Sequence, residues 1–183
     1  MIFFKTKHTM IVLYILLGAI ALLLILGLIV SKDMNYEKSV LIAAPIDKVW
    51  DNVSSLSAMD KWSPWKLKDP NMNQTHTGTD GTVGATQSWE SEVKNVGVGS
   101  QTIVNIEKPN SFETKLNFVK PFKSTADGYV TLAQEGDQVK ATWGFKSQMP
   151  YPMNVMKLFM NMEKSMSEDF GQGLNRLKGL CEG

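Results

Sequence analysis

The chain has 183 residues, of which 43% are apolar and 20% are charged, and a formal net charge of +1. These values are typical of a globular protein, and residues 35–183 are close to neutral, so no dense basic face for nucleic acid is expected. The single cysteine, Cys181, excludes an internal disulfide. Residues 35–183 contain one cysteine and one histidine, His76, which are too few ligands for a zinc site of the usual kind.

The N-terminal part contains an uncharged apolar run, residues 10–30, MIVLYILLGAIALLLILGLIV. As a helix it would be about 31 Å long, which matches a bilayer core of about 30 Å. The sequence therefore predicts a transmembrane helix at 10–30 behind a short tail, residues 1–9. A cleaved signal peptide is the alternative, but cleavage after Ala21 would leave nine apolar residues at the new N-terminus.

The orientation of this helix is weakly encoded. Lys5 and Lys7 precede the helix and Lys32 and Lys38 follow it, so the positive-inside rule decides little. The short basic tail is typical of a cytoplasmic N-terminus, and we expect the domain on the opposite side of the membrane. The linker, residues 31–34, reaches about 14 Å at most, which keeps the domain close to the membrane surface.

The first elements of the domain are a strand and short helices. Residues 36–43 are rich in strand formers, and Pro45 is suited to the first turn of a helix whose apolar residues recur at helical spacing. A second helical piece is expected around 57–61. Pro64 and Pro70 are expected to break regular structure after it.

A run of antiparallel strands and a long helix follow. Alternating apolar and polar residues predict a half-buried strand at 112–118, and Glu135, Gly136 and Asp137 predict a hairpin turn. A helix over 153–180 carries one apolar stripe. The order predicts an α+β fold in which this helix lies across a curved sheet. The other strands are expected at residues 86–92, 98–107, 129–133 and 139–146.

Several short motifs resemble a bacterial branch of the SRPBCC superfamily, the polyketide cyclase/dehydrase-like proteins. The superfamily also includes START lipid-transfer domains and the major birch-pollen allergen, and it has the helix-grip fold. Members of this branch often carry an N-terminal membrane helix, so the membrane would be a bacterial cytoplasmic membrane. The motifs are Ala44-Pro45 with Val49-Trp50, Trp62-Ser63-Pro64-Trp65, Asp69-Pro70-Asn71-Met72, Gly84-Ala85 with Trp89-Glu90, and the Met-rich residues 150–164.

The resemblance implies a deep cavity between the sheet and the long helix that admits a hydrophobic ligand. Methionine suits surfaces that fit varied apolar shapes, and ligand pockets are mostly apolar. The same residues could instead simply fill a core, and periodicity alone does not separate these alternatives. The residues expected to line the cavity are Trp89, Leu116, Phe118, Trp143, Phe145, Met153, Met156 and Met160.

Three functions remain open at this point. The first is a membrane-tethered domain that binds a hydrophobic small molecule or lipid, without metal or cofactor. The second is a polyketide cyclase- or dehydratase-like enzyme, which needs polar groups inside the cavity, with Tyr129, His76 and Glu113 as candidates. The third is a non-catalytic module that presents an exposed apolar surface to another protein.

Overall fold

The computed structural model describes residues 2–159 and 161–183, and the side chains of 9–159, 161 and 163–183. The chain divides into two compact units. The first comprises residues 1–34 and 148–162, and the second comprises residues 35–147 and 163–183. Two strands, β1 and β7, cross from one unit to the other.

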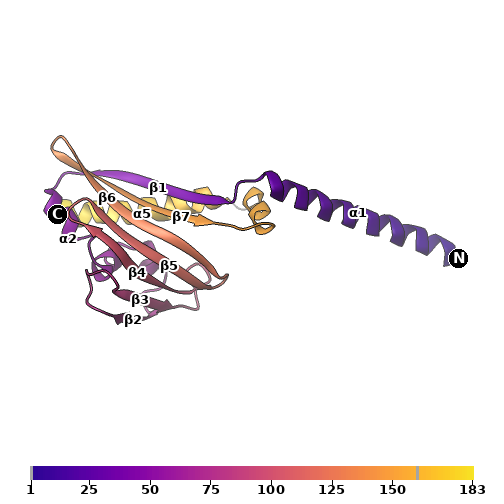
Figure 1. Ribbon diagram of the computed structural model, residues 1–183, viewed down its shortest axis with the longest axis horizontal. Coiled ribbons are helices and arrows are strands. Elements are labelled where there is room, and N and C mark those ends of the chain that lie inside the picture. The colour runs from indigo at the N-terminus through magenta and orange to yellow at the C-terminus, as the bar shows by residue number, and fades with distance from the viewer. Residues whose placement is uncertain (1, 160) are drawn as a thin grey trace. The chain divides into compact units, whose positions relative to one another are not determined.

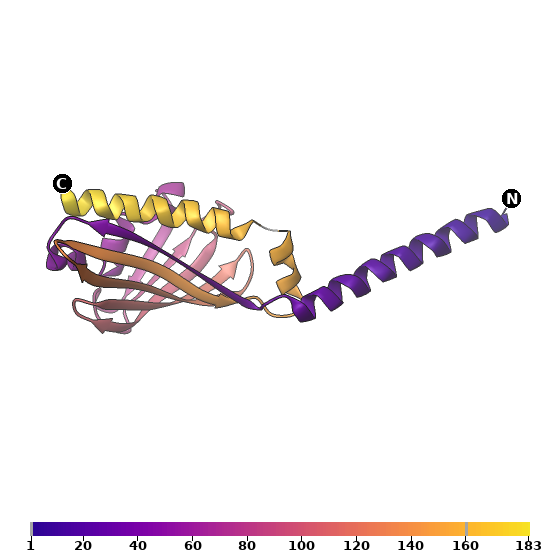
Figure 2. The same ribbon diagram turned by 90° about the horizontal axis from the view of Figure 1, so that it is seen from above.

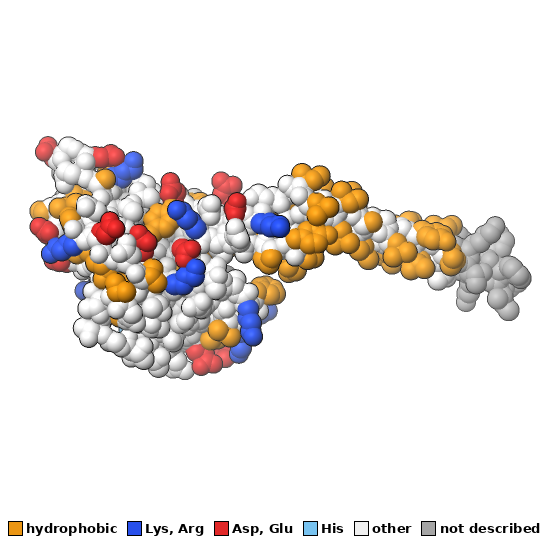
Figure 3. Space-filling model, in the orientation of Figure 1, with side chains coloured by type: hydrophobic (Ala, Val, Ile, Leu, Met, Phe, Trp, Pro, Cys, Tyr) orange, Lys and Arg blue, Asp and Glu red, His pale blue; other side chains and the backbone are white. Residues whose placement is uncertain are grey.

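The first unit contains α1, Ile2–Ile29, and the short 3-10 helix η1, Met153–Leu158. Residues Thr9–Ile29 of α1 are long and apolar enough to cross a membrane. Figure 3 shows the apolar side chains along this part of the helix. The helix thus matches the apolar run at 10–30 by length and composition.

The second unit is built on a seven-stranded sheet with the order β1-β7-β6-β5-β4-β3-β2 (Figure 1). The neighbours from β2 to β7 are paired antiparallel. The turn predicted at 135–137 joins β6 to β7, with Gly136 at a φ of 60°. The strands are β1, Asp33–Ile42; β2, Asn73–Thr77; β3, Thr86–Glu90; β4, Val98–Glu107; β5, Ser111–Lys120; β6, Ser124–Glu135; and β7, Gln138–Gln148.

Helices cover one face of this sheet, which we call the inner face. Three short helices follow β1, namely α2, Ile46–Asp51; α3, Leu56–Asp60; and α4, Pro64–Lys68. The long helix α5, Met162–Glu182, lies along the sheet (Figure 2). It buries Phe170, Leu174 and Leu177 in one core with the inner-face side chains. The α+β helix-grip fold expected from the sequence is confirmed.

Two local expectations were wrong, and one strand was not expected. The helix expected over 153–180 is two elements, η1 and α5, and η1 belongs to the first unit. Pro64 opens α4 rather than breaking structure, because a proline at the first helical turn loses no hydrogen bond. The polar segment Asn73–Thr77 is an edge strand, β2, whose exposed position explains why it lacks an apolar alternation.

Candidate ligand-binding site

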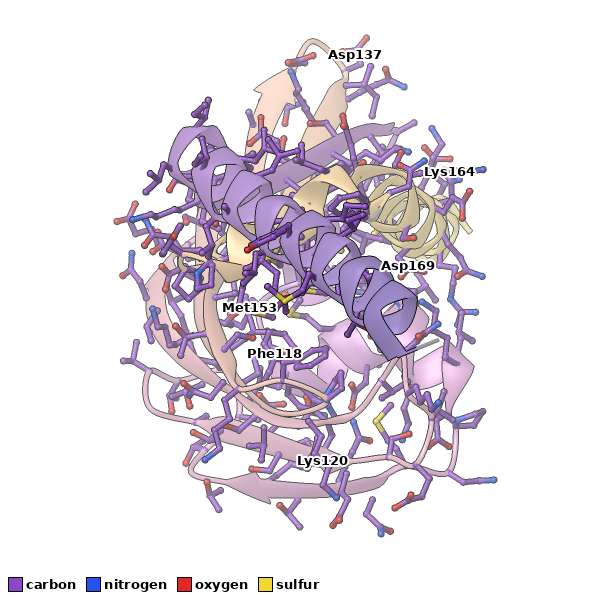
Figure 4. The ribbon with its side chains drawn as sticks, turned by 90° about the vertical axis from the view of Figure 1, so that its right-hand side faces the viewer. Phe118, Lys120, Asp137, Met153, Lys164 and Asp169 are labelled. Carbon is purple, nitrogen blue, oxygen red and sulfur yellow. The ribbon has the colours of Figure 1, made fainter. Side chains whose placement is uncertain are left out.

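The inner face is defined by strand alternation and register. On β5, Phe112 and Thr114 point to the core and are nearly fully buried, so Leu116 and Phe118 project from the same side. Directly paired residues of neighbouring strands share a face, which places Phe145 opposite Gly128 and Trp89 opposite Gly99 on this side. Figure 4 shows Phe118 on the inside of the curved sheet.

Burial changes along this face from one end to the other. At the end where β1 finishes and β7 begins, Ile42, Phe112 and Val139 are fully buried. At the opposite end the large apolar side chains of the inner face keep part of their surface exposed, although the smaller Ala126 and the polar Gln87 beside them are buried. Four of these belong to the predicted cavity lining, and we call them the apolar patch: Trp89, Leu116, Phe118 and Phe145.

Two glycines make room for the patch. A side chain at Gly99 would lie only 2.6 Å from the ring of Trp89, so the indole lies directly over this glycine. A side chain at Gly128 would come within 2.8 Å of Leu116. The glycines on β4 and β6 therefore alternate with large side chains on β3, β5 and β7. These side chains can lie this close to the glycine backbone only because the glycines have no Cβ. Trp89 and Phe118 meet edge to face, with ring centroids 6.0 Å apart.

Trp143 lies on the same face but is part of the solid core. Its ring stacks on Phe170 of α5 with centroids 4.1 Å apart, and it meets Trp62 and Trp65 edge to face. Trp62 itself is fully buried, and its Nε1 donates a hydrogen bond to the carbonyl of Asn52 at 2.8 Å. The Trp62-Ser63-Pro64-Trp65 motif thus supplies two rings to the core next to α5.

The predicted methionines lie in a different part of the molecule. Met153 and Met156 are in η1, in the first unit, where Met153 is exposed and Met156 is partly buried. Met160 lies outside the described residues. The structure therefore brings together Trp89, Leu116, Phe118 and Phe145 with Trp143 behind them, and it assigns Met153 and Met156 to the unit that contains α1.

The three candidate acid–base residues are not gathered in the interior. Tyr129 and Glu113 pair with each other on the outer face of the sheet. The Tyr129 hydroxyl donates to Glu37 at 2.7 Å, and desolvation, together with this carboxylate, raises the pKa of Tyr129 to about 12. His76 is exposed on the edge strand β2.

A polar cluster escaped the sequence analysis. The carboxylate of Asp60 at the end of α3 accepts hydrogen bonds from Gln87 Nε2 at 2.6 Å and Gln74 Nε2 at 3.2 Å. Burial raises the pKa of Asp60, and the two hydrogen bonds and the charges of Lys66 and His76 act against this rise. Gln87 could have been found, because it lies two residues before Trp89 and must share its face.

The helix-grip fold is that of the SRPBCC superfamily. Residues 34–182 match the model of a family described as "polyketide cyclase / dehydrase and lipid transport". The chain belongs to this family. No curated protein matches the sequence significantly.

Three solved structures with this fold share little sequence with the chain. A protein from Nitrosospira multiformis is 14% identical, with a TM-score of 0.59 over 81% of this chain and 96% of the other. Ara h 8.0201 is 12% identical, with a TM-score of 0.54 over 80% and 96%. The di-domain ARO/CYC StfQ from the steffimycin biosynthetic pathway is 8% identical, with a TM-score of 0.61 over 82% of this chain and 51% of that one. These likenesses show the fold.

Proposed function

We propose that residues 35–183 bind a hydrophobic small molecule or a lipid between the sheet and α5, against the apolar patch. The observation that carries the proposal is the change in burial along the inner face. Partly exposed aromatic and aliphatic side chains on the sheltered side of a curved sheet provide the apolar lining that ligand sites require. The family description, which includes lipid transport, supports the same class of ligand.

We propose further that α1 is an uncleaved transmembrane anchor and that the domain lies outside a bacterial cytoplasmic membrane. The apolar stretch Thr9–Ile29 supports an anchor. A C-terminal fusion to alkaline phosphatase, compared with a fusion to green fluorescent protein, tests the side. Phosphatase activity without fluorescence is expected, and the reverse pattern would place the domain in the cytoplasm.

Photocrosslinking tests the binding proposal. The full chain in lipid nanodiscs is irradiated with a diazirine-bearing palmitic acid, and labelled peptides are identified by mass spectrometry. We expect labelling within β5 and β3 that falls severalfold in Phe118→Ser. The matched control is Asn117→Ser, which changes the neighbouring exposed residue on the outer face and should leave labelling intact. Labelling confined to α1, or equal in both variants, would refute the proposal.

An enzyme of the cyclase or dehydratase type is the second candidate, and the cluster around Asp60 is the observation that favours it. A carboxyl group whose pKa is raised by burial is a candidate general acid or base. If the domain is an enzyme, ligands that co-purify with Asp60→Asn should be substrate instead of product: heavier by one water for a dehydration, or of equal mass but different chromatographic retention for a ring closure. If it only binds, both the masses and the retention times should agree.

A further inference from the structure

The segment Tyr151–Phe159 packs onto the last turn of α1 through side-chain contacts within the first unit. The ring of Tyr151 lies against Gly27, since a side chain at this glycine would come within 3.1 Å of the ring. A glycine in an apolar helix allows such close approach. The segment is therefore held against the helix rather than joined to it only through the chain.

Hydrogen bonds to Gly27 at the C-terminal end of α1, and to the residues that follow this helix, hold the same segment. The last carbonyls of a helix have no partner within the helix and carry partial negative charge. Asn154 Nδ2 donates to the carbonyls of Gly27 and Val30, both at 2.7 Å. The ammonium group of Lys157 donates to the carbonyls of Ser31 at 3.0 Å and Asp33 at 2.6 Å.

Asn154 is fully buried, and its Oδ1 has no hydrogen-bond partner. A polar side chain without a structural role would be expected at the surface, where water satisfies its amide group. The hydrogen bonds from Asn154 to the carbonyls of Gly27 in α1 and of Val30 just after it explain why a buried amide is kept there.

The outward side of the segment is apolar. Phe159 is 74% exposed and Leu158 is 54% exposed, and Tyr151 and Met153 are exposed as well. Exposed aromatic and aliphatic side chains beside a lysine are the composition of segments that lie in a membrane interface. Because Asn154 bonds the residues that end the apolar helix, this segment must lie at the depth of that helix end.

We propose that Tyr151–Phe159 is a membrane-interface segment that inserts Leu158 and Phe159 among phospholipid headgroups while Asn154 docks it to the end of α1. The proposal rests on the transmembrane assignment of α1 made above. It gives the Met-rich residues Met153 and Met156 a role at the lipid boundary.

Site-directed fluorescence on the full chain in phosphatidylcholine–phosphatidylglycerol vesicles tests the proposal. In a Cys181→Ala background, single cysteines replace Phe159, Leu17 in the middle of α1, and Asp137 in the β6–β7 turn, and each is labelled with an environment-sensitive nitrobenzoxadiazole. Lipids spin-labelled at acyl carbon 5 or 12 serve as shallow and deep quenchers. The label at Phe159 should emit to the blue of that at Asp137 and be quenched severalfold more by the shallow quencher.

The Leu17 label separates the two proposals. If Leu17 is quenched by the deep quencher while Phe159 is as unquenched as Asp137, the interface segment is refuted and the anchor stands. If Leu17 is unquenched, the anchor fails and the interface segment fails with it.

Docking is tested with Asn154→Ala, which should reduce shallow quenching at Phe159 at least twofold. The matched control is Gln148→Ala, which removes an amide donor to the Asp33 side chain instead of to α1 and should leave quenching unchanged. Equal quenching in the two variants would overturn the docking role of Asn154.

Discussion

Trp143 is packed in the core and Phe118 is partly exposed, so replacing each with alanine should lower the free energy of unfolding by very different amounts. Trp143→Ala empties a core position that is 6% exposed and removes the stack on Phe170 and the contacts with Trp62 and Trp65. Large-to-small changes of this kind cost about 3–5 kcal/mol. Loss of the aromatic pairs, worth about 0.5–1.5 kcal/mol each, favours the upper part of that range.

Phe118→Ala should cost far less stability. Phe118 is only partly buried, and among the described side chains its aromatic contact is with Trp89. Full burial of a phenylalanine contributes about 1.5–3 kcal/mol, so a partly exposed ring accounts for about 1 kcal/mol. We therefore expect a difference of at least about 2 kcal/mol between the two variants, with Phe118→Ala weakening ligand binding instead.

Guanidinium unfolding of the full chain in detergent micelles measures both values. The fluorescence of tryptophans that neither substitution removes, Trp62 and Trp65 in the core among them, reports unfolding in each variant. Equal losses of stability, or a larger loss for Phe118→Ala, would refute the division of the inner face into a packed core and a partly open patch.

Three further predictions concern other parts of the domain. The pKa of Asp60 is raised above 3.8 in the folded state, so its contribution to stability is complete below pH 3.8 and is lost as the pH rises through the folded pKa. The difference in unfolding free energy between the wild type and Asp60→Asn should therefore change over that pH range. A difference that stays constant with pH would contradict the raised pKa. Gly136→Ala should lower the stability by only the roughly 1–2 kcal/mol of a left-handed conformation, because Gly136 has a φ of 60° and open space around it. Gly97→Ala should lower it by well over that amount, because a Cβ there would also overlap the backbone at the end of β5. Thermal unfolding compares the two variants. Tyr129→Phe should lose at most about 1 kcal/mol and leave ligand binding intact, because its hydrogen bond to Glu37 lies on the outer face; impaired binding in isothermal titration would show that the outer face takes part.

The strand pattern made most of the fold predictable. Alternation on β5 correctly indicated which side chains face inward, and the turn at Gly136 fixed the β6–β7 hairpin. The edge strand β2 was missed because its residues are polar and mostly exposed, so no alternation marks it. Apolar periodicity marks a strand that buries one face, and an exposed edge strand buries neither face and so shows no such periodicity.

The site was only partly predictable for a related reason. Trp143 and Phe118 follow the same alternation, and only the tertiary contact with Phe170 shows that Trp143 belongs to the packed core. The apolar stripe over 153–180 did not reveal that Asn154 bonds α1, because the partners are more than a hundred residues away in the sequence. Such long-range pairings carry no local signal.

Native mass spectrometry of the full chain released from nanodiscs tests the central claim most directly. The wild type and Asn117→Ser should carry an additional apolar molecule that survives mild activation, and Phe118→Ser should be recovered mainly without it while unfolding cooperatively. A wild-type chain recovered without any bound molecule, or the same molecule bound equally by Phe118→Ser, would contradict a hydrophobic ligand site on the inner face.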